Sequence, residues 1–260
     1  MHDTALKLGR LFFEHYATAG ATIVDIGSFD VNGSLRSVAP PQTFYLGIDC
    51  EHGKGVDLAV PVGTTLPIRN DFAGIVVSSS QAEHDDFFWE TFLDMCRITK
   101  PEGFIYLNVP SNGSFHRYPQ DCWRFYPDSG TVLAKWARKN KQNVYLVESF
   151  IAYREKDQWN DFVAVFKKGE IAADTPLILD KIPHMNSRTF RDDKVGNLVA
   201  TSEDMKIIAE LRKRVAESDK RVAELEKQLQ AAQMPKVLEA TTESSNKTDV
   251  AQPVEPASAS

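Results

Sequence analysis

The chain has 260 residues, of which 42% are hydrophobic and 25% charged, as is typical of one soluble globular domain with appendages. Its formal net charge of −6 argues against a general nucleic-acid binder, which usually carries a basic face. No apolar run approaches the ~20 residues that span a bilayer, and the three cysteines have no metal-ligand spacing. We therefore expect a cytoplasmic protein without a transmembrane segment, a metal site or a nucleic-acid partner.

Residues 1–168 alternate between short apolar runs and amphipathic helical patterns, which predicts an α/β domain with a largely parallel sheet. A first helix carries Leu8, Phe12 and Tyr16 on one face, and further helices are predicted over 85–100 and about 129–140. The predicted strands, of which the last two are joined by a polar loop, are ATIVDIG, TFYLGID, GVDLAV, FAGIVVSSS, GFIYLNVP, NVYLVESF and DFVAVFKK.

The chain changes character after residue 168. Residues 169–201 are mixed and contain prolines, so we interpret them as a linker with room for a short helix. Residues 202–233 follow a heptad pattern that favours a parallel two-stranded coiled coil, and a lone surface helix is the alternative. The a positions are Ile208, Val215, Val222 and Leu229, and the d positions are Leu211, Ser218, Leu225 and Ala232. The tail 234–260 has no aromatic residue and is expected to be disordered.

The segment VDIGSFDVNGS follows the first strand and turns with Asp25, Gly27 and Gly33 at its corners. Glycines at such a turn let the backbone approach a ligand, and open α/β sheets bind nucleotides at strand ends of this kind. The dinucleotide motif GxGxxG is absent, because Phe29 stands where its second glycine would be. A glycine turn that joins a strand to a helix for packing reasons explains this segment equally well.

Asp49 ends the second strand, 22 residues beyond Gly27. A carboxylate in that place can accept hydrogen bonds from both ribose hydroxyls of an adenosine. Aspartate is also a common cap at strand ends, so the residue alone decides nothing. Together with the glycine turn, in the correct strand order, it favours a nucleoside-type ligand.

These features, with KPEG before the fifth strand and the closing pair of strands, resemble class I S-adenosylmethionine-dependent methyltransferases over about residues 5–168. DIGSFDVNGS, Glu83-His84 and the pattern HRYPxDxWRF from His116 to Phe125 are similar to one branch of that superfamily, often associated with bacterial surface-polysaccharide assembly. The resemblance implies a Rossmann-like sheet of seven strands with a terminal antiparallel hairpin, and S-adenosylmethionine as cofactor. The cofactor contacts it implies are Asp25, Gly27, Ser28, Asn32, Gly33, Asp49 and Ser79.

The sequence departs from this family in two places. There is no room for a helix between Asp49 and Asp57. The acidic residue that often contacts adenine is missing, and Pro61, Val62 and Gly63 occupy its stretch. A backbone amide could take over that contact.

The segment SFHRYPQDCWRFYPDSG, residues 114–130, follows the fifth strand, which in the family borders the place where the methyl group is delivered. His116 and Asp121 are candidates for a general base and the group that orients it. Arg124 is a candidate for gripping an anionic acceptor. His84 is a second candidate base, or a helix cap. The alternative for the segment is structural, with its aromatic rings closing the core and Arg124 paired with an aspartate.

Two functions follow from these residues. The first is an S-adenosylmethionine-dependent methyltransferase acting on a hydroxyl of a glycan or another small acceptor, with the coil making it a homodimer or binding a partner. The second is a catalytically silent methyltransferase-fold module presented by the coil. The missing adenine-side acid favours the second, whereas His116, Asp121 and Arg124 favour the first. The missing GxGxxG and the terminal hairpin argue against an NAD-dependent oxidoreductase.

Overall fold

The structure is a computed structural model, and it describes residues 3–156 and 158–233. The chain divides into two compact units between Ala200 and Thr201. The helices of the first unit are α1 (Asp3–Tyr16), η1 (Leu35–Val38), α2 (Phe88–Ile98), α3 (Pro127–Lys139) and η2 (Ile178–Lys181), where η marks a 3-10 helix. Its strands are β1 (Thr22–Ile26), β2 (Phe44–Asp49), β3 (Leu58–Ala59), β4 (Ala73–Ser79), β5 (Thr99–Pro110), β6 (Val144–Ala152), β7 (Asp161–Lys168), β8 (His184–Thr189) and β9 (Asp192–Gly196).

The strands form one mixed sheet in the order β3-β2-β1-β4-β5-β7-β6-β8-β9. The pairs from β3 to β5 are parallel, while β7 lies antiparallel to both β5 and β6. This arrangement confirms the predicted α/β fold, and the predicted hairpin of β6 and β7 is antiparallel but does not end the sheet. From β1 the chain runs outward through β2 to β3 and then crosses back to β4, on the other side of β1. Such a switch point is where open α/β sheets bind ligands.

The described residues contain nine strands, two more than the seven predicted. The extra strands β8 and β9 continue the sheet beyond β6, so residues 169–201 are not a simple linker. In β8, Met185 and Ser187 are buried and their neighbours are not. The sequence of β8 does not predict a strand, because it is short and polar and a buried serine gives no hydrophobic alternation.

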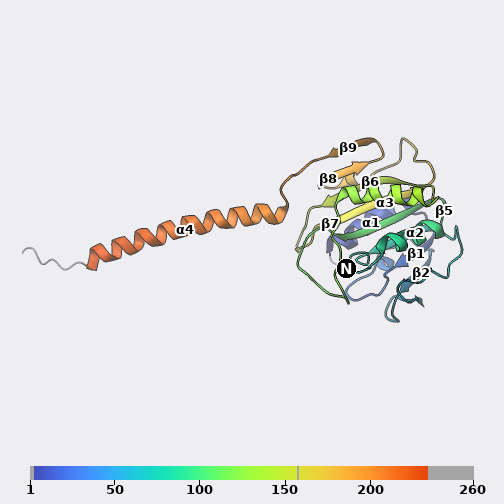
Figure 1. The fold of residues 1–260 in the computed structure, drawn as a ribbon, viewed down its shortest axis with the longest axis horizontal. Coiled ribbons are helices and arrows are strands. Elements are labelled where there is room, and N and C mark those ends of the chain that lie inside the picture. Colours follow the sequence, from blue (N-terminus) through green and yellow to red (C-terminus); the bar gives the residue numbers. More distant parts are fainter. Residues whose placement is uncertain (1–2, 157, 234–260) are drawn as a thin grey trace, which may run out of the picture. The chain divides into compact units, whose positions relative to one another are not determined.

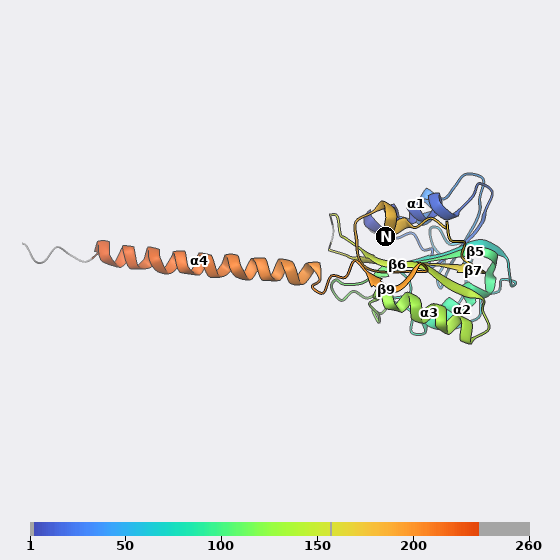
Figure 2. The same ribbon diagram turned by 90° about the horizontal axis from the view of Figure 1, so that it is seen from above.

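Helices cover both faces of the sheet, with α1 on one side and α2 and α3 on the other (Figure 1, Figure 2). The predicted apolar face of α1 is confirmed, because Leu8, Phe12 and Tyr16 are buried in the cluster that α1 shares with η1 and η2. On the opposite face, Phe92 and Cys96 of α2 are buried against β4, β5 and α3. The two clusters fix the sheet and thereby the strand ends that form the site.

Three boundaries differ from the predicted ones. The second helix begins at Phe88 and not near Asp85, because the Asp85 carboxylate accepts a hydrogen bond from the amide of Phe87 and holds a turn. The sequence KPEG does not stop that helix, which already ends at Ile98, but lies inside β5. The third helix begins with Pro127, a residue suited to a first helical turn.

The second unit contains α4 (Glu203–Gln233), so a helix is present where the heptad pattern predicted one. None of its side chains is buried, and the apolar a and d residues are exposed. Among the described residues, no helix has both the length and the apolar character needed to cross a membrane. The expected disordered tail, 234–260, lies outside the described residues.

Candidate active site

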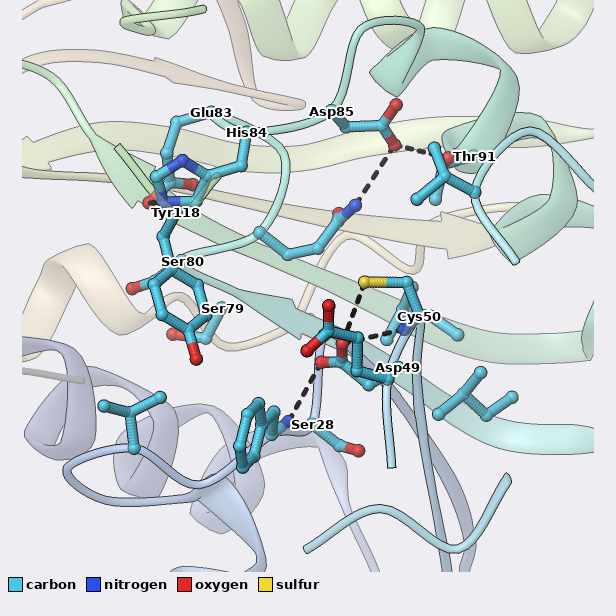
Figure 3. Close-up of a pocket in the computed structure, with 18 of the residues that line it drawn as sticks. Ser28, Asp49, Cys50, Ser79, Ser80, Glu83, His84, Asp85, Thr91 and Tyr118 are labelled. Carbon is cyan, nitrogen blue, oxygen red and sulfur yellow. Dashed lines mark hydrogen bonds and ion pairs between the residues drawn. The ribbon is translucent and has the colours of Figure 1, made fainter. Parts of the chain in front are cut away.

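A cavity of about 810 Å³ opens at the carboxyl ends of β1, β2 and β4. Of the predicted catalytic residues, His84 and His116 line it, whereas Asp121 and Arg124 do not. Figure 3 shows Glu83 and His84 next to each other on one side of this space, with Asp49 and Cys50 across from them. All the predicted cofactor contacts line it, namely Asp25, Gly27, Ser28, Asn32, Gly33, Asp49 and Ser79.

Gly27 lies where the loop after β1 packs against the loop after β4. Its φ of +82° is a left-handed conformation, and a Cβ built on it would lie 2.5 Å from the Cβ of Gln81, in the loop after β4. The glycine is therefore needed for the close approach of these loops, which is the packing role left open by the sequence. Because both residues also line the cavity, the same contact shapes the binding space.

The Asp49 carboxylate is held at the end of β2 by two backbone amides. The amide of Phe29 donates to Oδ2 at 3.0 Å, and that of Cys50 donates to Oδ1 at 2.7 Å (Figure 3). Sγ of Cys50 also donates to Oδ1 at 3.4 Å, a weak hydrogen bond that a ligand hydroxyl can displace, so each oxygen can accept one hydrogen bond from a ligand. The fixed carboxylate can thus accept from two neighbouring hydroxyl groups of a ligand.

Ser28 and Asp25 line the same part of the cavity as Asp49. A Cβ built on Gly47 would come within 2.6 Å of Oγ of Ser28, so this hydroxyl packs against β2. Asp25 is buried and accepts a hydrogen bond from the hydroxyl of Tyr45 at 2.8 Å. Burial raises the pKa of its carboxyl to about 7. A cation in the cavity would favour the ionised form of Asp25.

Buried polar side chains form a hydrogen-bond network that begins at Ser79, in the wall of the cavity. Oγ of Ser79 donates to Oδ1 of Asn108 at 3.0 Å, and Nδ2 of Asn108 donates to Oδ1 of Asp161 at 3.0 Å. These residues lie on β4, β5 and β7, so the network holds three strand ends in fixed positions. Ser79 is thus mainly a structural member of the cavity wall.

The loop after β5 is organised around Arg124. Its Nη1 donates to Oδ1 of Asp121 at 2.5 Å and its Nη2 to Oδ2 at 2.7 Å. The remaining N–H groups bond to the carbonyl groups of Asn112, Ser114 and Trp123. All five guanidinium N–H groups are therefore used inside the loop. This geometry opposes the expectation that Arg124 grips an anionic acceptor and gives it a positioning role.

Asp121 connects this pair to His116. Its Oδ2 accepts a hydrogen bond from the backbone amide of His116 at 2.8 Å and lies 3.3 Å from the imidazole Nδ1. The hydrogen bonds from Arg124 hold the pKa of the Asp121 carboxyl at about 2. A permanently ionised carboxylate beside Nδ1 keeps the proton on that nitrogen and leaves Nε2 as an acceptor. The structure thus places His116 and Asp121 side by side.

His84 faces His116 across the loop, with ring centroids 4.9 Å apart. Its Nδ1 contacts the carbonyl of Gln120, and burial lowers its pKa. The side-chain amide of Gln120 donates to the backbone carbonyl of His84 at 3.0 Å. These hydrogen bonds connect the loop after β4 with the loop after β5. His84 thus lines the cavity and does not cap α2, whose N-cap residue is Phe87.

Glu83 is the residue that the sequence analysis did not select for the site. Its side chain is 1% exposed, and burial raises its pKa to about 8. Its Oε1 lies 3.7 Å from Nε2 of His84, while Oε2 has no hydrogen-bond partner in the part of the chain that is described. In the sequence, only its place beside His84 pointed to a role in the site. Its burial could not be predicted, because it depends on the loop after β5 folding over it. There, the amides of Cys122 and Trp123 donate to the Glu83 carbonyl.

The aromatic residues of the loop divide between core and surface. Phe125 is buried against Phe88 and Phe162, as the structural alternative predicted. Trp123 is partly exposed, and its indole N–H donates to the carbonyl of Asp85 at 2.8 Å. Tyr126 is exposed. On the far side of the cavity, where no acidic residue was found, the wall is formed by Val60, Pro61, Val62, Gly63 and Leu66.

No protein-family profile matches the sequence. The chain is 27% identical over 152 residues to an uncharacterized methyltransferase of Mycobacterium avium (strain 104), which covers 53% of this chain and 59% of the relative. A second uncharacterized methyltransferase, from Mycobacterium bovis (strain BCG / Pasteur 1173P2), is 27% identical over 118 residues, or 41% of this chain and 46% of the relative. The chain thus spans about half the length of these curated relatives.

Among solved structures, the chain is similar to the 1,6-didemethyltoxoflavin-N1-methyltransferase of Burkholderia thailandensis, crystallised with 1,6-didemethyltoxoflavin and S-adenosylhomocysteine. The TM-score is 0.51 at 14% sequence identity, over 64% of this chain and 79% of that one. At this identity the likeness concerns the fold. The first unit of the chain therefore has the α/β fold of the S-adenosylmethionine-dependent methyltransferases.

Proposed function

We propose that the chain is an S-adenosylmethionine-dependent methyltransferase that methylates a hydroxyl group of a glycan or another small acceptor. One observation carries the proposal: Asp49, at the end of β2, and His116, on the loop after β5, line the same cavity. Asp49, which can bind a nucleoside, and His116, which can accept a proton, thus lie in the same cavity. The names of the mycobacterial relatives and the S-adenosylhomocysteine bound to the structural neighbour support the proposal.

The residues around the cavity fit this cofactor. The volume of about 810 Å³ lies within the ~300–1,000 Å³ usual for small-ligand sites. Asp49 would accept hydrogen bonds from the ribose hydroxyls, and Asp25 would face the positively charged part of the ligand. Val60 and Leu66 would contact the adenine. When bound, S-adenosylmethionine supplies a methyl group on a positively charged sulfur.

The acceptor hydroxyl must lose a proton as its oxygen attacks the methyl carbon. We propose that the cluster of Glu83, His84 and His116 activates this hydroxyl. In the simplest form, Nε2 of His116 accepts the proton and the Asp121 carboxylate stabilises the resulting imidazolium. Arg124 acts through Asp121, because its hydrogen bonds hold that carboxylate in place.

A dimer through α4 is a separate proposal, supported by its charged residues. In a parallel, in-register pair of α4 helices, the g position of one chain faces the following e position of the other. Arg214 and Arg221 occupy g, and they would meet Asp219 and Glu226 at e in the second copy. An antiparallel pair would bring g residues together and oppose arginine to arginine. The charges therefore favour a parallel homodimer.

Methyl transfer tests the proposed activity directly. The full-length chain is incubated with methyl-labelled S-adenosylmethionine and a panel of free glycosides, sugar nucleotides and small alcohols. We expect label on at least one acceptor, and a loss of turnover of about 10²–10⁴-fold in His116→Gln. The matched control is His52→Gln, which replaces an exposed histidine that does not line the cavity. A chain that binds the cofactor but labels none of these acceptors would instead support the catalytically silent binding module.

A further inference from the structure

Glu83, His84 and His116 bring three metal-binding groups to one point of the cavity. One ligand atom from each of them lies within 4.8 Å of those of the other two. Glu83 and His84 belong to the loop after β4, and His116 to the loop after β5. The cluster therefore joins two loops that both follow strands at the ligand-binding edge of the sheet.

In both imidazole rings, the nitrogen Nδ1 lies beside an oxygen atom of the loop after β5. Nδ1 of His84 contacts the carbonyl of Gln120. Nδ1 of His116 lies 3.3 Å from Oδ2 of Asp121 and 3.4 Å from the carbonyl of Ser114. Because carbonyl and carboxylate oxygens only accept, Nδ1 carries the proton in each ring and Nε2 keeps its lone pair. Metal-binding histidines are usually oriented by such a second hydrogen bond.

Glu83 gives a second, independent observation. Its side chain is 1% exposed, yet its Oε2 has no hydrogen-bond partner among residues 3–156 and 158–233. A buried polar atom without a partner is costly and rare in native proteins. The nearby cation does not supply that partner, because all N–H groups of Arg124 bind Asp121 and backbone carbonyls. The Glu83 carboxylate, which carries this unpaired oxygen, thus lies in one cluster with both imidazole rings, and its Oε1 is 3.7 Å from Nε2 of His84.

We infer that Glu83, His84 and His116 form a binding site for a divalent transition-metal ion such as Zn²⁺. Two imidazole nitrogens and one carboxylate are a donor set that such ions prefer, and three protein ligands leave a position open for a further molecule. Ligands at ~2.1 Å from a tetrahedral ion lie about 3.4 Å apart, so the widest separation in the cluster, at most 4.8 Å, must shorten by up to about 1.4 Å. The half-exposed ring of His116 can make this movement.

The role of this site rests on the proposed function. An ion held here would bind the acceptor oxygen beside the methyl donor and stabilise its negative charge. His116 would then serve as a ligand and not as the proton acceptor, and the bound hydroxyl, whose pKa the ion would lower, would release its proton to water. The existence of the site is independent of that role, because metal binding can be measured without any acceptor.

The test uses Co²⁺ as the probe, because its visible absorption reports both binding and coordination geometry. The full-length chain, free of affinity tags, is titrated with Co²⁺, and bound metal is counted after dialysis. We expect one ion per chain with the spectrum of a nitrogen and oxygen site. Glu83→Gln and His116→Ala should each weaken Co²⁺ binding at least about 100-fold, while His52→Ala should bind as the wild type does.

A wild-type chain that binds no Co²⁺, or variants that bind it as tightly as the wild type, would overturn the inference. If Glu83→Gln does not fold, His116→Ala decides, because that side chain lies on a partly exposed loop. S-adenosylhomocysteine binding is measured on the same samples by calorimetry without metal. Failure to bind Co²⁺ and failure to bind S-adenosylhomocysteine are therefore distinguished in each sample.

Discussion

Arg124 and Asp121 form a two-point ion pair within the loop that follows β5. Nη1 and Nη2 of the arginine donate to Oδ1 and Oδ2 of the aspartate at 2.5 and 2.7 Å. The Asp121 side chain is 1% exposed, and its carboxylate also accepts the amide hydrogen of His116. The pair therefore fixes the backbone that carries His116 into the cavity.

We predict that Arg124→Ala lowers the free energy of unfolding by about 2–4 kcal/mol, because it leaves the Asp121 charge buried without a partner. Arg124→Lys should recover only part of this loss, since an ammonium group cannot make two parallel bonds and three carbonyl contacts. Urea unfolding of both variants measures the effect. A normally stable Arg124→Ala protein with a raised KM for the acceptor would contradict the positioning role and restore the acceptor-gripping one.

We predict that Gly27→Ala destabilises the chain and weakens cofactor binding, because its new Cβ would meet Gln81 at 2.5 Å. Gly20→Ala is the matched control. Gly20 has a similar φ of +77°, but a Cβ there would meet nothing within 4 Å. The control should therefore lose only the ~1–2 kcal/mol of left-handed strain and bind S-adenosylhomocysteine normally. Equal losses of stability and affinity in both variants would show that the contact with Gln81 has no role.

The sheet could be predicted where strands are buried on both faces. β1 and β4 each contain a short apolar run, whose residues Val24, Val76 and Val77 are buried. β8 could not, because a polar strand at the edge of a sheet has no such pattern. Its place depends on pairing with β6, a contact between residues far apart in the sequence.

The candidate site was predictable to the extent that residues follow strand ends. Gly27 and Asp49 lie in the cavity because parallel strands end at one edge. The role of Arg124 was not predictable, since its partners include the carbonyl groups of Asn112 and Ser114, which only the path of the loop brings together. Glu83 was overlooked for the same reason, because a glutamate in a loop is usually exposed.

Asp25 predicts a pH dependence of stability. Its carboxyl has a pKa of about 7 in the folded chain, against 3.8 for the ordinary value. The folded state therefore binds more protons than the unfolded state between about pH 4 and pH 7. Over that range, the contribution of Asp25 to the stability of the free chain falls as the pH rises, by up to about 3–4 kcal/mol.

Asp25→Asn should remove this contribution, since an amide does not ionise there and can still accept from Tyr45. Urea unfolding at pH 5 and pH 8, without ligand, measures the difference. We expect a smaller drop in stability in the variant than in the wild type. Burial also raises the pKa of Glu83 to about 8 and that of Glu148 to about 7, so these two carboxyls leave a residual drop in both proteins. Identical drops would contradict a buried, protonated Asp25.

The α4 charges predict the oligomeric state. Arg221→Glu should raise the dimer dissociation constant roughly tenfold, because it places like charges opposite each other in both halves of a parallel dimer. Adding Glu226→Arg should restore it. A chain ending at Ala200 should be a folded monomer that keeps β8 and β9. Sedimentation equilibrium checks all three, and a monomeric wild-type chain or a dimeric truncated chain would contradict the parallel coil.

The most direct test of the account is a calorimetric titration of the full-length chain with S-adenosylhomocysteine, repeated with NAD and with the variant Asp49→Ala. We predict binding of S-adenosylhomocysteine at one site and none of NAD. Asp49→Ala should weaken that binding by about 1–3 kcal/mol, because the ribose hydroxyls lose their acceptor. Glu14→Ala, which changes an exposed residue of α1, is the control and should bind normally. Unchanged affinity in Asp49→Ala, or no binding by the wild-type chain, would contradict the assignment of this cavity to S-adenosylmethionine.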